Sequence, residues 1–125
     1  MITSRQITAT SVTSPEVVFT ATTTGAAIGG AVTGQISAIT TMILCNTGAP
    51  TISDETVNTV SVNIYLVKNT DVPGADNLIV SNLTIPAGET VFFSDEKIIL
   101  DGGDMIQVGT SAASLVTVTV SSLPV

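Results

Sequence analysis

The sequence predicts an all-β protein: a single-domain antiparallel β-sandwich, jelly-roll-like, of about eight strands with an N-terminal arm. Val, Ile and Thr dominate the 125 residues, and no sustained apolar pattern at helical spacing occurs. Several segments alternate apolar and polar residues, as half-buried strands do. Turn-forming residues recur about every dozen positions, which is typical of sandwiches.

The expected strands lie between segments rich in Gly, Pro, Asn and Asp. We expect strands at about 6–12, 15–23, 35–46, 57–68, 77–83, 90–99, 104–109 and 115–121. We expect one domain overall. Within it, residues 1–35 form the N-terminal arm and first strands, which engage neighbouring subunits, and residues 36–125 form the core of the sandwich.

The region before residue 36 contains a distinctive apolar segment of small residues, GAAIGGAV at 25–32. It fits a flexible loop or a bulged strand. It also fits an arm that orders against a neighbouring subunit, because small residues permit close backbone approach. We expect the N-terminal segment to be the first part that reaches a neighbour, and the loop NTDVPGADN at 69–77 to be the second.

The middle and the end of the chain carry the clearest strand patterns. QISAITTMILCN, at 35–46, becomes apolar on both faces, as a central strand would be. In VSVNIYLV, at 60–67, Val, Ile and Leu face one way, and Ser, Asn and Tyr face the other. In LVTVTVSSL, at 115–123, three valines alternate with Thr and Ser. The last two segments therefore predict half-buried antiparallel strands.

IPAGETVFF, at 85–93, combines a tight turn at Pro86 and Gly88 with a strand that follows at once. Phe92 and Phe93 point to opposite faces of that strand. One is expected to fill the core, and the other is a candidate contact anchor. The alternative is that both are buried within two packed layers.

LDGGDMIQV, at 100–108, places Asp101 and Asp104 on either side of two glycines. Asp-Gly is a strong hairpin signal, because Gly supplies a positive φ and Asp bonds its local backbone. A weak surface cation site and a catalytic pair are the alternatives. We interpret the segment as a hairpin turn, and we expect Asp101→Asn or Asp104→Asn to leave assembly almost unchanged.

Composition argues against several classes of partner. Three basic and ten acidic residues give a net charge of −7, which disfavours binding to nucleic acid or to an anionic membrane. No run reaches the roughly 18 apolar residues of a membrane span, and MITSRQITATSVTSP lacks the apolar part of a secretory signal. Only 10% of the residues are charged, so the surface suits contacts with other proteins.

The residues give little support to catalysis, and we expect no enzyme activity, no catalytic, cofactor-binding or metal-binding residues, and no cofactor. The chain has no histidine to act as a conventional base, and its single cysteine, Cys45, sits among apolar neighbours as a buried hydrophobic residue would. The two SDE segments, at 53–55 and 94–96, have paired carboxylates. Loop solvation or capping of a short turn is their expected role.

The second half of the chain resembles a known group of proteins. MILCNTGAPTISDETVNTVSVNIYLV and LTIPAGETVFFSDEKIILDGGDMIQVGTSAASLVTVTVSSL are similar to segments of small β-sandwich virion proteins of tailed bacteriophages. The resemblance covers roughly residues 36–121 and consists of turn and strand patterns. It implies a structural component of a phage particle, located in the virion and assembled in the host cytoplasm.

Within that group, the resemblance implies a capsid decoration (cement) subunit that bridges capsomers. Its partners would be the major capsid protein or other virion proteins, and copies of itself in a homotrimer. A place in the neck, tail or baseplate is an alternative. A carbohydrate- or surface-binding β-sandwich module is an alternative of another class, which the scarcity of aromatic residues disfavours.

Overall fold

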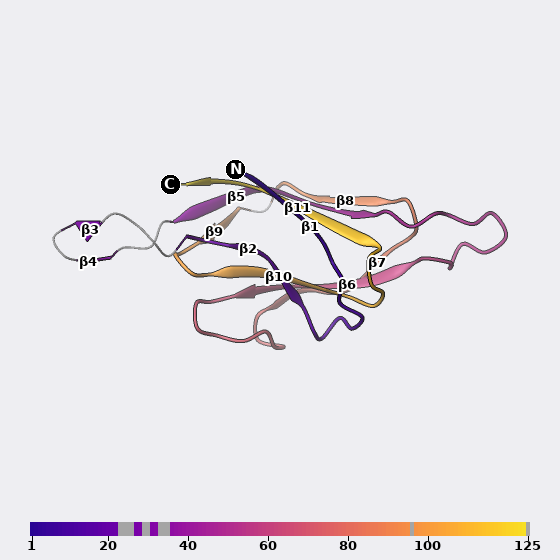
Figure 1. Ribbon diagram of the computed structural model, residues 1–125, viewed down its shortest axis with the longest axis horizontal. Coiled ribbons are helices and arrows are strands. Elements are labelled where there is room, and N and C mark those ends of the chain that lie inside the picture. Colours follow the sequence, from indigo (N-terminus) through magenta and orange to yellow (C-terminus); the bar gives the residue numbers. More distant parts are fainter. Residues whose placement is uncertain (23–26, 29–30, 33–35, 96, 125) are drawn as a thin grey trace.

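Two antiparallel sheets pack face to face in the computed structural model (Figure 1), which describes residues 1–22, 27–28, 31–32, 36–95 and 97–124. Sheet A consists of β1 (Ile2–Gln6), β11 (Val116–Pro124), β5 (Ser37–Asn46), β8 (Thr90–Phe93) and β9 (Ile98–Leu100). Sheet B consists of β2 (Glu16–Thr20), β10 (Met105–Thr110), β6 (Val60–Val67) and β7 (Leu78–Ile85).

The strand order confirms the predicted sandwich and gives it the connectivity of a jelly roll. Sheet A runs β1-β11-β5-β8, with β9 also paired to β5, and sheet B runs β2-β10-β6-β7. The chain passes back and forth between the sheets, so strands that follow one another in sequence mostly lie in different layers. Of the nine sandwich strands, only β6 and β7 are sequential partners in one sheet. This is the double Greek key of jelly-roll domains.

The core lies between the sheets and is built from the apolar residues of the alternating strands. Val60, Val62 and Ile64 of β6 and the three valines of β11 are at most 1% exposed. Full burial of such a side chain stabilises the fold by about 1.5–3 kcal/mol. The alternation at 60–67 and 116–120 therefore predicted both the strands and the side of each strand that faces the core.

Two strand predictions were wrong in position. The first strand is β1 at 2–6 rather than 6–12, because the chain leaves sheet A after Ile7 and crosses to sheet B. The single strand expected at 90–99 is two short strands, β8 and β9, which pair with different parts of β5.

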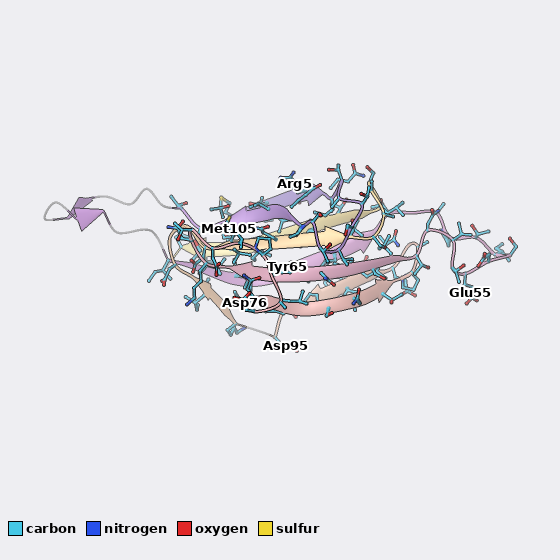
Figure 2. All side chains as sticks on the ribbon, turned by 90° about the horizontal axis from the view of Figure 1, so that it is seen from below. Arg5, Glu55, Tyr65, Asp76, Asp95 and Met105 are labelled. Carbon is cyan, nitrogen blue, oxygen red and sulfur yellow. The ribbon has the colours of Figure 1, made fainter. Side chains whose placement is uncertain are left out.

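Both ends of the sandwich carry extensions (Figure 1). β3 (Ala27–Ile28) and β4 (Ala31–Val32) pair only with each other and project beyond one end. The loop at 47–59 extends from the opposite end, and Glu55 lies on it in Figure 2. The other residues of the GAAIGGAV segment lie outside the described residues. In the part of the chain that the structure describes, no helix is suited to crossing a membrane.

Candidate interaction surface

The outward side of sheet A has partly or fully exposed side chains along all five of its strands, and we call it the open face. Its residues are the outward-pointing positions of five strands, as fixed by the register and by the burial of the alternate positions. They are Ile2, Ser4, Gln6, Ala38, Thr40, Thr41, Ile43, Cys45, Thr90, Phe92, Ile99, Thr117, Thr119, Ser121 and Leu123. None of these side chains is charged.

Large apolar side chains stand exposed on the open face. Ile2 is 73% exposed, Phe92 64%, Ile99 60% and Leu123 56%. They come from four different strands, so the sheet pairing gathers residues that are far apart in sequence. Such a cluster of exposed apolar groups on a sheet is a mark of a contact surface.

Hydroxyl groups fill the spaces between these apolar residues. The Oγ of Ser4 and the Oγ1 of Thr119 lie 2.9 Å apart, and the Thr40 hydroxyl lies 3.0 Å from that of Ser121. Across the sheet, Phe92 pairs with Ile43, and Ile43 pairs with Thr119. The open face therefore combines aliphatic, aromatic and hydroxyl groups and has no charged side chain.

Charged residues are concentrated away from the strands. Of the acidic residues that the structure describes, only Glu16 lies within a strand, and the others lie in the loops and turns. Charge therefore surrounds the sheets without lying on the open face.

The outward side of sheet B, which we call the covered face, is different because the chain folds over it. The segment between β1 and β2 passes so close that a Cβ added at Gly109 would lie 2.4 Å from the carbonyl oxygen of Val12. Only glycine fits this crossing. Asn63 and Tyr65 point outward from β6, yet each is only 4% exposed.

The buried polar groups of the covered face satisfy one another. The amide N–H of Asn82 donates to the Oδ1 of Asn63 at 2.7 Å. The Nδ2 of Asn63 donates to the Tyr65 hydroxyl at 3.2 Å, which donates in turn to the Val12 carbonyl at 3.0 Å. This chain of hydrogen bonds fastens the crossing segment to the sheet and leaves little for a partner to bind.

One long edge of the sandwich is closed by an ion pair between β1 and β2. The Nε of Arg5 lies 3.2 Å from the Oε2 of Glu16, and its guanidinium also donates to the Val17 carbonyl at 3.0 Å. The other oxygen of Glu16 accepts from the amide and the hydroxyl of Thr8. Burial works against ionisation, but the Thr8 hydrogen bonds and the Arg5 charge outweigh it and hold the pKa of Glu16 below its usual 4.5.

The opposite edge contains irregular strands and an apolar cleft. The pairing of β7 with β6 shifts register twice, and Asn82 has a positive φ of 52° there. Such bulges discourage another strand from pairing with the edge. Beside it lies a cleft of about 340 Å³, lined by Met42, Leu66, Ile79, Val80, Phe93 and Ile98.

The DGGD segment is a turn, but the predicted hairpin is wrong. β9 pairs with β5 in sheet A, whereas β10 pairs with β2 and β6 in sheet B, so the turn links the two layers. Gly103 has a φ of 92°, and the amide of Asp104 donates to the Asp101 carbonyl at 3.0 Å. The Asp104 carboxylate accepts from the backbone amides of Asn69 and Asp101, so it joins two loops.

The other residues singled out in the sequence have structural settings. Asp54 accepts from the amide and hydroxyl of Thr56, which lower its pKa and cap a short turn, as expected. The second SDE segment includes residue 96, which lies outside the described residues. Cys45 is partly exposed on the open face rather than buried. Among the described residues, no three His, Cys, Asp or Glu side chains converge.

The two phenylalanines face opposite sides, as predicted. Phe93 packs against the core, and Phe92 is exposed on the open face. Ile43, which pairs with Phe92, and Ile99, which pairs with Ala38 farther along β5, were not singled out, because only the pairing of β5 with β8 and β9 places them on the same face.

The two segments expected to reach neighbours have defined places within the described residues. β1 and β2 are edge strands of the two sheets. The loop at 69–77 is held by Asn77, whose side chain bonds the Val72 carbonyl and the Gly74 amide. Engagement of a neighbour by either segment stays a prediction.

Neither a scan against protein-family models nor a search of curated proteins found a match for this chain.

Proposed function

We propose that this chain is a structural protein of a bacteriophage particle, and specifically a capsid decoration (cement) subunit. It would stabilise the head by bridging capsomers, with the major capsid protein as its partner and a homotrimer as its working form. The observation that carries the proposal is the open face: an uncharged sheet surface from which Phe92, Ile99, Leu123 and Ile2 protrude.

The proposed role requires only noncovalent binding to other proteins of the particle. Burying exposed apolar area contributes about 25 cal/mol per Å², so a face with several exposed apolar side chains favours association. Repetition over a symmetric shell adds many such contacts through effective concentration. The jelly-roll connectivity is compatible with this role, since viral capsid domains are among its users, although lectins and cupins use it too.

The same face would serve a protein of the neck, tail or baseplate, which is the first alternative. Electron microscopy of particles that lack this chain separates the two. Heads that stay intact but lose surface knobs support decoration, and loss of tails supports the alternative. Particles of unchanged composition and shape contradict both.

A carbohydrate-binding module is the alternative of another class, and one feature favours it. A hollow of about 500 Å³, with both polar and apolar side chains, lies between the loop at 47–59 and the turn at 86–89; it is lined by Pro50, Thr51, Glu55, Thr56, Thr59, Pro86, Ala87 and Glu89. Its lining contains no aromatic ring on which a sugar could stack. Binding to a glycan array that Thr56→Ala and Glu89→Ala abolish would establish this alternative.

A complementation experiment tests the role of the open face in the particle. Particles lacking the chain are supplied with wild-type protein or with the double variant Phe92→Lys/Ile99→Lys. We expect wild type to restore the surface density and the double variant not to restore it. Equal restoration by both proteins would contradict a contact role for this face.

A further inference from the structure

We propose that the open face is buried between copies of this chain, so that the partner of Phe92 and its neighbours is a second copy rather than the shell. This inference rests on the contact role proposed above and names the partner of the same surface. Contact with the shell would then be made by other parts of the surface, such as the loops.

The chemistry of the open face makes it complementary to itself. A hydroxyl group both donates and accepts hydrogen bonds, so Thr and Ser on one copy can satisfy Thr and Ser on another. Apolar side chains likewise match apolar side chains. A face of fixed donors or of one charge would instead require a partner of opposite character.

The distribution of charge points the same way. Two copies that each carry −7 repel one another, and this repulsion falls off within about 8–10 Å at physiological salt. Contact through a face without charged side chains avoids placing like charges directly opposite each other. A basic shell protein would be met better by the acidic loops than by this face.

The size of the face suits such an interface. The 31 residues of β1, β5, β8, β9 and β11 each occupy about 3.3 by 4.8 Å of the sheet, so the open face measures about 500 Å². A standard protein interface buries about 800 Å² on each partner. The open face alone therefore supplies most of the area that a stable complex needs.

The other surfaces of the strands are less suited to self-association. The middle of the outward side of sheet B, at Tyr65 and Gly109, is covered by the segment around Val12. The β1–β2 edge is tied by Arg5 and Glu16, and the β7 edge is bulged at Asn82. Association by edge-to-edge pairing is discouraged, so packing through the open face is the favoured route.

The chain carries its own reporter on this face. Cys45 is its single cysteine. It lies on β5 and pairs with Thr90 of β8 on one side and with Thr117 of β11 on the other. It is partly exposed in the single chain. A thiol reagent such as a maleimide should therefore reach it in the monomer and be excluded from it in an oligomer built through the open face.

The experiment measures the mass of the purified full chain by light scattering and the rate of Cys45 modification over a dilution series. We expect a mass that is a multiple of 12.7 kDa at high concentration, and modification at least about tenfold slower there than after dilution. Phe92→Lys/Ile99→Lys should give a monomer whose Cys45 reacts rapidly at every concentration.

Two further variants serve as controls: one tests the interface at a second position, and the other tests whether any exposed charge causes dissociation. Thr119→Lys places a charge on β11, in the row of Ile43 and Phe92, and should also give a monomer. Ile52→Lys changes a still more exposed apolar residue on the loop at 47–59, away from the open face, and should remain oligomeric. Circular dichroism confirms that each variant is folded.

Three outcomes would overturn the inference. In the first, the wild type is a monomer whose Cys45 reacts rapidly throughout. In the second, Cys45 of the wild-type oligomer is modified as fast as Cys45 of the double variant, which would mean that the interface of the oligomer lies elsewhere. In the third, Cys45 of a monomer becomes protected only when particles are added. The third result would identify a shell protein as the partner and would leave the proposed binding to the shell intact, without a homotrimer in solution.

Discussion

The open face and the covered face belong to two layers of one sandwich, but their outward side chains differ in burial and in hydrogen bonding. On sheet B, Asn63 and Tyr65 are buried and bonded to Asn82 and Val12. On sheet A, Phe92 and Ile99 are left exposed between hydroxyl groups. The chain thus covers the middle of one layer itself, at Asn63, Tyr65 and Gly109, whereas the outward side of the other layer is available for another molecule.

The difference between the two faces is tested most strongly at Gly109, which lies beneath the segment that crosses the covered face. Gly109→Ala forces a Cβ against the Val12 carbonyl, 2.4 Å away, and should lower the free energy of unfolding by about 3 kcal/mol. Gly74→Ala is the matched control, since its Cβ would meet only the movable Asp76 side chain. Denaturant titration at low protein concentration measures both, and equal midpoints would refute the tight crossing.

The adjacent phenylalanines of β8 provide the next test, because the same substitution affects the core at one position and the open face at the other. Phe93→Thr removes a ring packed against the core and should cost about 2–3 kcal/mol of unfolding free energy. Phe92→Thr should change it by less than about 0.5 kcal/mol. Similar losses in thermal or denaturant unfolding would mean that the two rings are equally engaged within one chain.

A smaller effect is expected at the Tyr65 hydroxyl of the covered face. Tyr65→Phe leaves the Val12 carbonyl and the Asn63 amide without their partner and should cost about 1–1.5 kcal/mol. Thr40→Val removes a partly exposed hydroxyl of the open face, and we expect a loss below about 0.5 kcal/mol. Should Thr40→Val prove the more costly, the proposed division between the faces would be wrong.

The smallest effect concerns Glu16, which joins the two sheets at their edge. Its pKa in the folded protein is lower than the usual 4.5, so its carboxylate stabilises the fold above that pH and loses this contribution as the pH falls through the folded pKa. Glu16→Gln should cost less than about 1 kcal/mol at neutral pH.

Unfolding free energies of wild type and Glu16→Gln, measured from neutral to acidic pH, test this assignment. We expect the two curves to converge on acidification. A gap that stays constant, or widens in acid, would show that the charge of Glu16 does not stabilise the edge.

The sequence was most informative where local pattern and final environment agree. The alternating residues of β6 and β11 predicted their strands and their buried sides, and the pair Phe92 and Phe93 predicted one exposed ring. In each case the alternation itself decides which side chain faces the core.

Features set by long-range packing could not be predicted in this way. Ile7 and Ala9 are buried alternately as in a strand, but they lie where the chain passes from one sheet to the other. Asp101 and Gly102 have the chemistry of a hairpin, yet the turn joins strands of different layers. The open face likewise depends on which strands become neighbours, and no short segment contains that information.

The pairing of β1 with β11 has a consequence for how the molecule is made. Ile2 lies opposite Ser121. Sheet A can therefore be completed only after both of these distant segments, β1 and β11, are present. Topologies rich in such distant pairings fold in milliseconds to seconds rather than microseconds. During synthesis β1 and β5 therefore lack their shared neighbour β11 until it emerges, and chaperones would matter most during this delay.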